Sequence, residues 1–369
     1  MIYLDYNATA PMRPSVKRCV IEALDVSGNP SSIHSSGRRA RAMVEKARGQ
    51  IANSFGVRHE NIIFTSGATE ANTLALAGSK CRRVFVSGVE HHSVLEAVDH
   101  VEKIAVDQDG LVSPECLDTL LRHNGNSVLV SVMLANNETG VIQPIAELAR
   151  IAHDYGALFH CDAVQAPGRI PLNMNDLGVD LMTLSAHKIG GPNGVGALFL
   201  APGIEVASTM NGGGQERGRR GGTENVAAIA GFGAAAMYVN EMLNKAGQIG
   251  KLRDGMEQAI LEQAPEVVIH GHKVPRLVNT SLFGVDGVSA ETQVIALDLS
   301  GIAISSGSAC SSGKVGPSHV LRAMGLSESM SASSIRVSIG VETKEEEITR
   351  FVDAWVSSLK MIKQQVDAA

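Results

Sequence analysis

The stretch Asp180-Leu-Met-Thr-Leu-Ser-Ala-His-Lys188 decides the fold class, because a short apolar run leads here into a polar cluster that ends in a lysine. Further apolar runs lie on both sides of it, at residues 83–87, 127–134, 157–161 and 196–200. Short β-rich runs without polar alternation are typical of strands that are buried on both faces of a parallel sheet. Segments with apolar residues at helical spacing, such as residues 145–153, separate them. This alternation predicts an α/β fold.

The sequence pattern changes near residue 250. An amphipathic segment at residues 251–263 is followed there by shorter β-rich runs and by a helical pattern that begins at Lys344. The length of 369 residues suits two or three domains at roughly 150 residues per domain. We therefore expect a large domain of residues 15–255 and a smaller α+β domain of residues 1–14 and 256–369, although no linker marks the boundary.

Composition and charge argue against several classes of protein. Apolar residues make up 44% of the chain and charged residues 19%, which is typical of a globular protein and not of a disordered one. A net charge of −6 and the lack of a Lys/Arg block disfavour a nucleic-acid partner. The longest uncharged stretches, residues 225–240 and 189–204, are shorter than the about 20 apolar residues of a membrane span, and no signal peptide is visible. We expect a cytoplasmic protein that binds neither nucleic acid nor a membrane.

The five cysteines are widely spaced and form no CxxC pair. Neither a disulfide framework nor a metal site is therefore expected.

Polar side chains follow four of the apolar runs, at the edge where the carboxyl ends of neighbouring strands would meet. They are Glu90, His91 and His92, then Asn136, Asn137 and Glu138, then Asp162 and Gln165, and finally His187 and Lys188. Taken singly, each could be a turn residue, a helix cap or a solvated loop charge. Their coincidence predicts a ligand site, because ligands of open α/β sheets bind at this edge.

The segment Ser66-Gly-Ala-Thr-Glu70 lies between an apolar run and an Ala/Leu-rich helical pattern. A helix start can bind an anion through its free N–H groups, and Thr69 would add a hydroxyl, although an ordinary capped helix would look the same. The glycine-dense loops at residues 190–194 and 212–223 match neither a P-loop nor a dinucleotide fingerprint, which disfavours a nucleotide. A lysine amine, a carboxylate and an anion cradle on one sheet edge are what pyridoxal phosphate (PLP) requires.

Together these motifs resemble those of the cysteine desulfurases of the NifS/IscS type. The motifs are Ser66-Gly-Ala-Thr-Glu70, Glu90-His91, Asp162-Ala-Val-Gln165, Ser185-Ala-His-Lys188 and Ser305-Ser-Gly-Ser-Ala-Cys310, with Arg336 downstream. The motif that ends in Cys310 is the most specific of them, and the resemblance runs nearly end to end. It implies a PLP-dependent transferase of fold type I, in the class V aminotransferase group. Such a protein has a mainly parallel sheet flanked by helices and a smaller α+β domain that carries the nucleophilic cysteine. Ala186 departs from the glycine that is common before the histidine.

The resemblance also assigns the residues that hold the cofactor. Lys188 would bind it covalently, Asp162 would pair with the pyridinium nitrogen, Gln165 would bond the ring hydroxyl, and His91 would stack on the ring. The phosphate would lie among Ala68, Thr69, Ser185 and His187, with Thr223 of a partner subunit, and Asn137 would lie beside the ring and the substrate.

The implied reaction removes sulfur from L-cysteine and leaves alanine and a persulfide on Cys310. Lys188 would move the substrate Cα proton, His91 would act as acid and base, and Arg336 would bind the substrate carboxylate as a bidentate pair. The small residues around Cys310 favour an accessible loop, which a sulfur nucleophile needs. Cys161 lies within an apolar run, and no motif surrounds Cys81 or Cys116, so these are expected to be buried or incidental thiols.

The implied partners are a second copy of the chain, in a homodimer, and an iron–sulfur scaffold or other sulfur-acceptor protein. Two alternatives stay open from the sequence. The first is another fold type I enzyme, such as a selenocysteine lyase or an aminotransferase, which would not need Cys310 in its loop. The second is a pseudo-enzyme that serves as a scaffold, which the complete set of catalytic residues disfavours.

Overall fold

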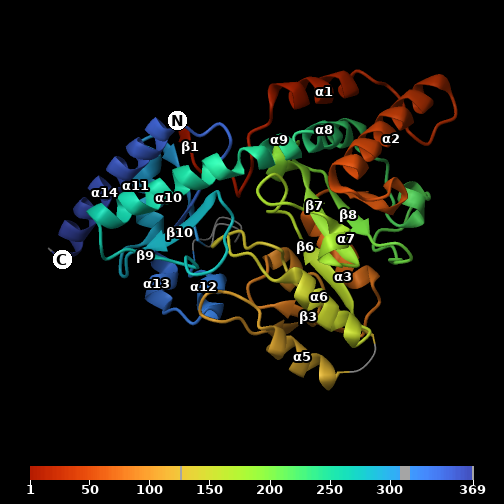
Figure 1. Ribbon diagram of the computed structural model, residues 1–369. Coiled ribbons are helices and arrows are strands. Elements are labelled where there is room, and N and C mark those ends of the chain that lie inside the picture. Colours follow the sequence, from red (N-terminus) through yellow and green to blue (C-terminus); the bar gives the residue numbers. More distant parts are fainter. Residues whose placement is uncertain (125–126, 308–315, 368–369) are drawn as a thin grey trace.

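The computed structural model describes residues 1–124, 127–307 and 316–367. Its main feature is a seven-stranded sheet in the order β2-β8-β7-β6-β5-β3-β4. Figure 1 shows β6, β7 and β8 of this sheet side by side. The strands are β2 (Ile62–Thr65), β3 (Arg83–Ser87), β4 (Glu102–Ile104), β5 (Val128–Ser131), β6 (Leu158–Asp162), β7 (Leu181–Ser185) and β8 (Gly196–Leu200). The pairs among β4, β3, β5, β6 and β7 are parallel, and β8 runs antiparallel to both β7 and β2. The α/β prediction is confirmed, and the five apolar runs are β3, β5, β6, β7 and β8.

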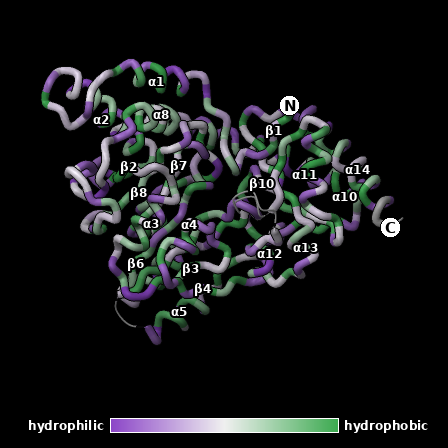
Figure 2. Tube along the Cα trace, turned by 180° about the vertical axis from the view of Figure 1, so that it is seen from behind, coloured by the Kyte–Doolittle hydropathy of each residue, from purple (hydrophilic) through white to green (hydrophobic). Residues whose placement is uncertain are grey.

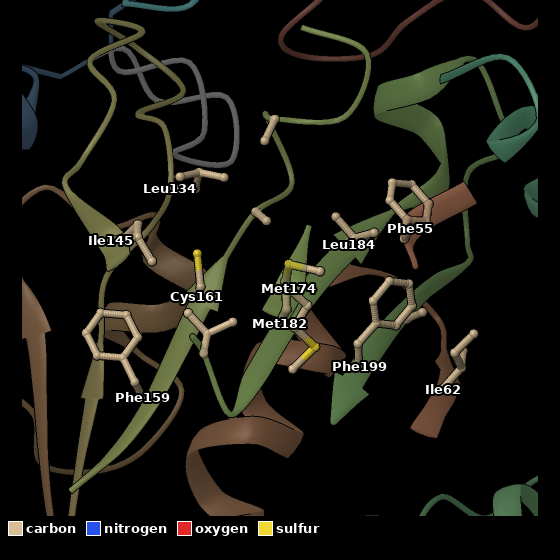
Figure 3. Close-up of a cluster of buried hydrophobic side chains, with 14 of the residues drawn as sticks. Phe55, Ile62, Leu134, Ile145, Phe159, Cys161, Met174, Met182, Leu184 and Phe199 are labelled. Atoms are coloured by element: carbon tan, nitrogen blue, oxygen red, sulfur yellow. The ribbon is translucent and has the colours of Figure 1, made fainter. Parts of the chain in front are cut away.

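Successive residues of these strands are buried in two different layers, which explains why the runs lack polar alternation. In β8, for example, Phe199 packs into one apolar cluster and Leu198 into the other. Figure 3 shows the first cluster, in which Phe159 and Cys161 of β6 lie near Met182 and Leu184 of β7.

Helices cover both faces of this sheet. The first cluster includes residues of α1 (Pro14–Leu24), α2 (Ser35–Phe55), α5 (Pro114–Arg122), α6 (Ile145–Asp154) and α8 (Val226–Ala236). The second cluster is formed mainly with α3 (Ala68–Gly78) and α4 (His92–Leu95). Two short helices, α7 (Met174–Leu177) and α9 (Val239–Asn244), complete this part of the chain before the long α10 (Ala246–Gln263).

A second body of structure is built around a four-stranded antiparallel sheet in the order β12-β13-β10-β9. Its strands are β9 (Val268–Ile269), β10 (Thr280–Gly284), β12 (Ser305–Ser306) and β13 (Ser334–Ser338), and β1 (Ile2–Tyr3) pairs in parallel with β11 (Ile302–Ala303) nearby. The helices are α11 (Ala290–Leu299), α12 (His319–Ala323), α13 (Glu328–Ser333) and α14 (Glu345–Asp367). Figures 1 and 2 place α10, α11 and α14 at the opposite end of the molecule from α1 and α2.

The apolar core of this second body contains Ile2 and Leu4 of the N-terminal segment as well as residues of α10, α11 and α14. Trp355 of α14 meets Phe283 of β10 edge-on, with their ring centroids 5.3 Å apart. Helix α10 runs across residue 255, and its Ile249, Met256 and Ile260 all belong to this core. The domain limits expected from the sequence stay a prediction.

The segment Val226–Asn244 is long and apolar enough to cross a membrane by length and composition alone, and 56% of it is buried within the protein. It comprises α8 and α9, and residues of α8 share the first apolar cluster with residues of α1 and α2. Packing against these helices accounts for its apolar composition.

Candidate active site

One cavity collects most of the residues that the sequence singles out. Its volume is about 520 Å³, and it lies where β6 and β7 end and α3 begins. The predicted residues that line it are Ala68, Thr69, His91, Asn137, Asp162, Gln165, Ser185, His187 and Lys188. Side chains that are far apart in the sequence therefore meet at the carboxyl edge of the sheet, as predicted.

Lys188 reaches this cavity from the turn that follows β7. The strand ends at Ser185, and a short 3-10 helix, η2 (Ala186–Ile189), carries the lysine before the chain turns at Gly190 with a φ of 76°. The Lys188 ammonium donates to the main-chain carbonyls of Asn7 and of Ala8, the latter at 2.9 Å. The amine is thus positioned by the segment that follows β1, a contact for which the sequence carries no local signal.

Asp162 ends β6 and is buried. Burial raises the pKa of Asp162, and two donors and the charge of Lys188 act in the opposite direction. The donors are Nδ2 of Asn72, 2.8 Å from Oδ2, and the main-chain N–H of Val164, 3.0 Å from Oδ1. A fully buried carboxylate that keeps such donors is suited to pair with a buried cation.

Asn72 was not singled out by the sequence, although it connects two predicted residues. It lies on α3 and donates both to Asp162 and to the Ser93 hydroxyl, which is 2.9 Å away. The only sequence signal is a polar amide within an Ala/Leu-rich helix, and an asparagine in such a place can equally well point to solvent or bond its own helix backbone.

His91 precedes α4, and its Nδ1 lies 2.8 Å from the Ser93 hydroxyl and accepts from the Ser93 N–H at 3.0 Å. Burial, and then the charge of Lys188, lower the pKa of His91 to about 4. His187 lies on the other side of Lys188 in the sequence, and its Nδ1 is 3.0 Å from the Thr9 hydroxyl. Burial and Lys188 lower the pKa of His187 to about 4 as well. Both imidazoles are therefore neutral near pH 7.

The start of α3 forms one wall of the cavity. Gly67 occupies the N-cap position and has no side chain to satisfy the first N–H groups of Ala68 and Thr69, which leaves them able to bind an anion. Gly196 of β8 allows this close approach, because a Cβ atom there would lie 2.7 Å from the Gly67 carbonyl carbon. The Glu70 carboxylate accepts a hydrogen bond from the Ser66 N–H. It also forms a 2.7 Å ion pair with Arg220 of the glycine-rich loop, residues 212–223.

Thr223 lies in the same glycine-rich loop and is exposed. It does not line the cavity formed by the described residues of its own chain. The contact of Thr223 across a dimer stays a prediction.

Arg336 lies on β13, is 1% exposed, and is held close to the cavity without lining it. Its Nη2 donates to Asp5 at 2.6 Å, and its Nη1 donates to the carbonyl of Asn137 at 3.0 Å. Its Nε has no hydrogen-bond partner within residues 1–124, 127–307 and 316–367. The guanidinium is thus adjacent to a cavity residue and paired with Asp5, a partner that the sequence did not suggest.

Cys310 lies outside the described residues, but the chain on both sides of it approaches Glu138, which follows the cavity residue Asn137. Gly307 follows β12, and on the other side the Ser318 hydroxyl donates to the Glu138 carboxylate at 2.5 Å. Burial raises the pKa of Glu138 to about 7, against the effect of Ser318. Among the other cysteines, Cys161 is fully buried in β6 as expected (Figure 3), Cys81 is half-buried and Cys116 is exposed.

Comparison with known proteins decides the family. The class-V aminotransferase family matches residues 2–351. The chain belongs to this family. Its similarity to individual members extends over nearly the whole length of both proteins.

The cysteine desulfurase IscS of Dictyoglomus turgidum is 41% identical over 367 residues, which cover 95% of this chain and 93% of the relative. The cysteine desulfurase of Enterobacter agglomerans is 40% identical over 359 residues, with coverage of 94% and 90%. An X-ray structure of a NifS-like protein from Rickettsia africae ESF-5 matches with a TM-score of 0.89 and 38% identity, and covers 98% of this chain and 99% of that one. The resemblance, the fold type, the PLP dependence and the cysteine desulfurase activity predicted from the sequence are confirmed at the level of this family.

The donor set around the cavity fits PLP. Lys188 supplies an amine, Asp162 supplies a buried carboxylate, and the uncapped start of α3 supplies N–H groups for a phosphate. These three groups face one space of sufficient volume for a cofactor and a small amino acid. Bound PLP would supply an electron sink for the carbon chemistry of an amino acid.

Proposed function

We propose that this protein removes the sulfur atom of L-cysteine and transfers it to its own Cys310. The reaction consumes cysteine and the Cys310 thiol, and it yields alanine and a Cys310 persulfide, so that all atoms balance. The observation that carries the proposal is that Lys188, Asp162 and the start of α3 line one cavity. Gly307 and Ser318, on either side of the segment of Cys310, lie beside Glu138, the neighbour of the cavity residue Asn137. The names of the similar proteins support the same activity.

Each residue in or beside the cavity would have a separate role in the reaction. Asp162 keeps a negative charge on the pyridine side, because Asn72 and the Val164 N–H stabilise its ionised form. Lys188 takes the Cα proton of the substrate, and neutral His91, held by Ser93, accepts or returns a proton. Arg336 would bind the substrate carboxylate by giving up part of its contact with Asp5.

The experiment is an assay of alanine and sulfide formed from L-cysteine by the PLP-loaded enzyme in the presence of a thiol reductant. Lys188→Ala should abolish both products and the visible absorbance of the bound cofactor, because the covalent anchor and the base are lost together. Cys310→Ala should keep the bound cofactor and lose sulfur transfer. Sulfide release at a near wild-type rate by Cys310→Ala would contradict the proposal and favour a lyase.

The partners belong to the same proposal. We infer a homodimer in which Thr223 reaches the phosphate side of the partner's cavity, because its loop is exposed and is tied to α3 through Glu70 and Arg220. The persulfide sulfur would pass to an iron–sulfur scaffold or another acceptor protein, as the IscS name of a relative suggests. A cytoplasmic location fits a reactive thiol, since thiols stay reduced there.

A further inference from the structure

Arg169 is a buried cation one turn after Gln165, and its role is assigned neither by the sequence motifs nor by the proposed reaction. It is 6% exposed, and no carboxylate within the described parts of the chain forms an ion pair with it. Burial, and then the charge of Arg336, lower the pKa of Arg169 to about 9. A buried charge is unfavourable unless hydrogen bonds compensate for it. The groups that accept hydrogen bonds from Arg169 therefore indicate its role.

The acceptors of Arg169 are all carbonyl oxygens. Nη1 donates to the Gln165 main-chain oxygen at 3.1 Å and also to the Gln165 side-chain oxygen, and Nη2 donates to the Tyr6 carbonyl at 3.3 Å. Two of the three bonds therefore hold a residue that lines the cavity.

These contacts fix which end of the Gln165 amide faces the cavity. Arginine has donors and no acceptor, so the amide oxygen must face Arg169 and the amide nitrogen must face away from it. The Gln165 Nε2 accordingly donates to the Asn7 carbonyl at 3.1 Å. The Lys188 ammonium donates to the same carbonyl, so the Gln165 N–H group and the Lys188 amine meet at one point of the cavity wall.

We propose that Arg169 is a positioning residue that holds the Gln165 side chain with its N–H group turned toward the ring oxygen of bound PLP. The inference rests on the proposed function, because it takes Gln165 as the neighbour of that oxygen. Without Arg169 only the Asn7 carbonyl would hold the amide in this orientation, and an amide that turned over would present its carbonyl oxygen, which would oppose an anionic ring oxygen. Arg169 would thus make the site selective for the ionised form of the cofactor without touching it.

The test uses the PLP-loaded enzyme and the pKa of its visible absorbance band, which reports the proton next to the ring oxygen. A donor to that oxygen favours loss of the neighbouring proton, so it lowers this pKa. Arg169→Met should raise the pKa by about one pH unit, the size of a lost hydrogen bond to a charged group. Gln165→Ala should raise it by a similar amount.

The double variant separates positioning from a direct effect of charge. If Arg169 acts through Gln165, Arg169→Met should change the pKa by less than about 0.3 pH unit in the Gln165→Ala background, since coupled residues are not additive. Equal shifts in both backgrounds, or no shift in Arg169→Met alone, would overturn the inference.

Two controls keep the result interpretable. Arg150→Met removes an exposed arginine of α6 and should leave the band unchanged. If Arg169→Met does not fold, Arg169→Lys carries the test: it keeps the charge but cannot donate to Gln165 and Tyr6 together, and it should give a partial rise that also disappears in Gln165→Ala. A wild-type protein that loads no PLP on Lys188 would refute the proposed function, whereas additive shifts in a loaded enzyme would refute only the role of Arg169.

Discussion

The electrostatic balance of the site depends on single residues that keep buried charges hydrogen-bonded. Asp162 would be protonated more readily by burial alone, and Asn72 is the side chain that opposes this through a 2.8 Å hydrogen bond. Because Asn72 also donates to Ser93, it links the carboxylate to the residue that holds His91. The Asn72 amide therefore positions both Asp162, directly, and His91, through Ser93, the two groups that would face the cofactor ring.

Asn72→Leu should raise the pKa of Asp162 and weaken cofactor binding. The loss of a hydrogen bond to a charged group costs about 1.5–3 kcal/mol, so the dissociation constant of PLP should rise roughly 10- to 100-fold. Equilibrium titration with PLP measures this. Asn72→Asp is not a suitable control, since it adds a charge, whereas Thr119→Val, at an exposed position of α5 that does not line the cavity, should leave the affinity unchanged.

Glu90 makes the stability of the folded protein depend on pH, separately from any effect of pH on catalysis. Burial raises the pKa of Glu90 from 4.5 to about 8, against hydrogen bonds from Ser87 and from the Met133 N–H. The folded state therefore holds a proton that the unfolded state releases above pH 4.5. The contribution of Glu90 to stability is then present at low pH and is lost as pH rises toward 8.

Glu90→Gln should gain stability relative to the wild type between pH 5 and pH 8, by at most about 1.4 kcal/mol per pH unit. Urea unfolding of both cofactor-free proteins at several pH values measures the difference. Taking the difference removes the contribution of the buried histidines, whose lowered pKa values act in the opposite direction in both proteins. A constant difference across this range would show that Glu90 is ionised in the folded protein.

At the scale of elements, the ends of strands and helices position the site, and a buried ion pair fixes the glycine-rich loop. The Glu216 carboxylate in that loop pairs with Arg48 of α2 at 2.7 Å and accepts from the N–H of Phe64 on β2 at 3.0 Å. Glu216 has a φ of 46°, so the loop is held in a conformation that side chains rarely adopt. The contacts of Glu216 with Arg48 and Phe64 thus fix the middle of the loop that leads to Thr223.

Glu216→Gln should lower the free energy of unfolding by about 3 kcal/mol, because it leaves Arg48 buried without its buried carboxylate partner. Thermal and urea unfolding measure the loss. Glu45 also contacts Arg48 but is largely exposed, so Glu45→Gln is the matched control and should cost well below about 1 kcal/mol.

Cys161→Ala tests the division between structural and reactive cysteines. Its side chain packs within the first apolar cluster, and burial raises the pKa of its thiol well above the usual value, so it is a poor nucleophile. The variant should lose about 1 kcal/mol of stability and keep full sulfur transfer. Loss of transfer with the fold intact would show that Cys161 takes part in the reaction.

At the scale of the whole molecule, the cavity depends on contacts between segments that are far apart in the chain. Asn7 follows β1 and is fully buried; its side chain bonds the Thr280 hydroxyl at 2.9 Å and the Asn137 carbonyl at 3.1 Å, and its carbonyl accepts from Gln165. The N-terminal segment thus joins the antiparallel sheet to the cavity.

This arrangement explains what the sequence could and could not predict. Asp162, Gln165, His187 and Lys188 were predictable, because each lies at or just after the end of a strand and parallel strands present their carboxyl ends at one edge. Asn72, Asn7, Asp5 and Arg169 were not, because their partners are fixed only by tertiary packing. Arg336 was named through resemblance, and its pairing with Asp5 has no local signal in either segment.

Thr223 allows a test of assembly by mixing variants. Thr223→Val should weaken PLP binding, and Lys188→Ala should load no cofactor covalently. If Thr223 acts across a dimer, hybrids of the two variants contain one site with both residues intact and should regain tight binding and activity. If it acts within its own chain, mixing restores nothing. Native mass spectrometry should confirm that hybrids formed.

The central claim is that the sulfur of L-cysteine is transferred to Cys310, and a single-turnover experiment tests it most directly. The PLP-loaded enzyme is mixed with sulfur-labelled L-cysteine without reductant, and the alanine released and the modified peptide are quantified by mass spectrometry. The result expected is one alanine for each labelled sulfur, with the label on Cys310, removable by reductant and absent from Cys161. Labelled sulfide released together with an equal amount of pyruvate and ammonia, while Cys310 stays unmodified, would contradict the claim.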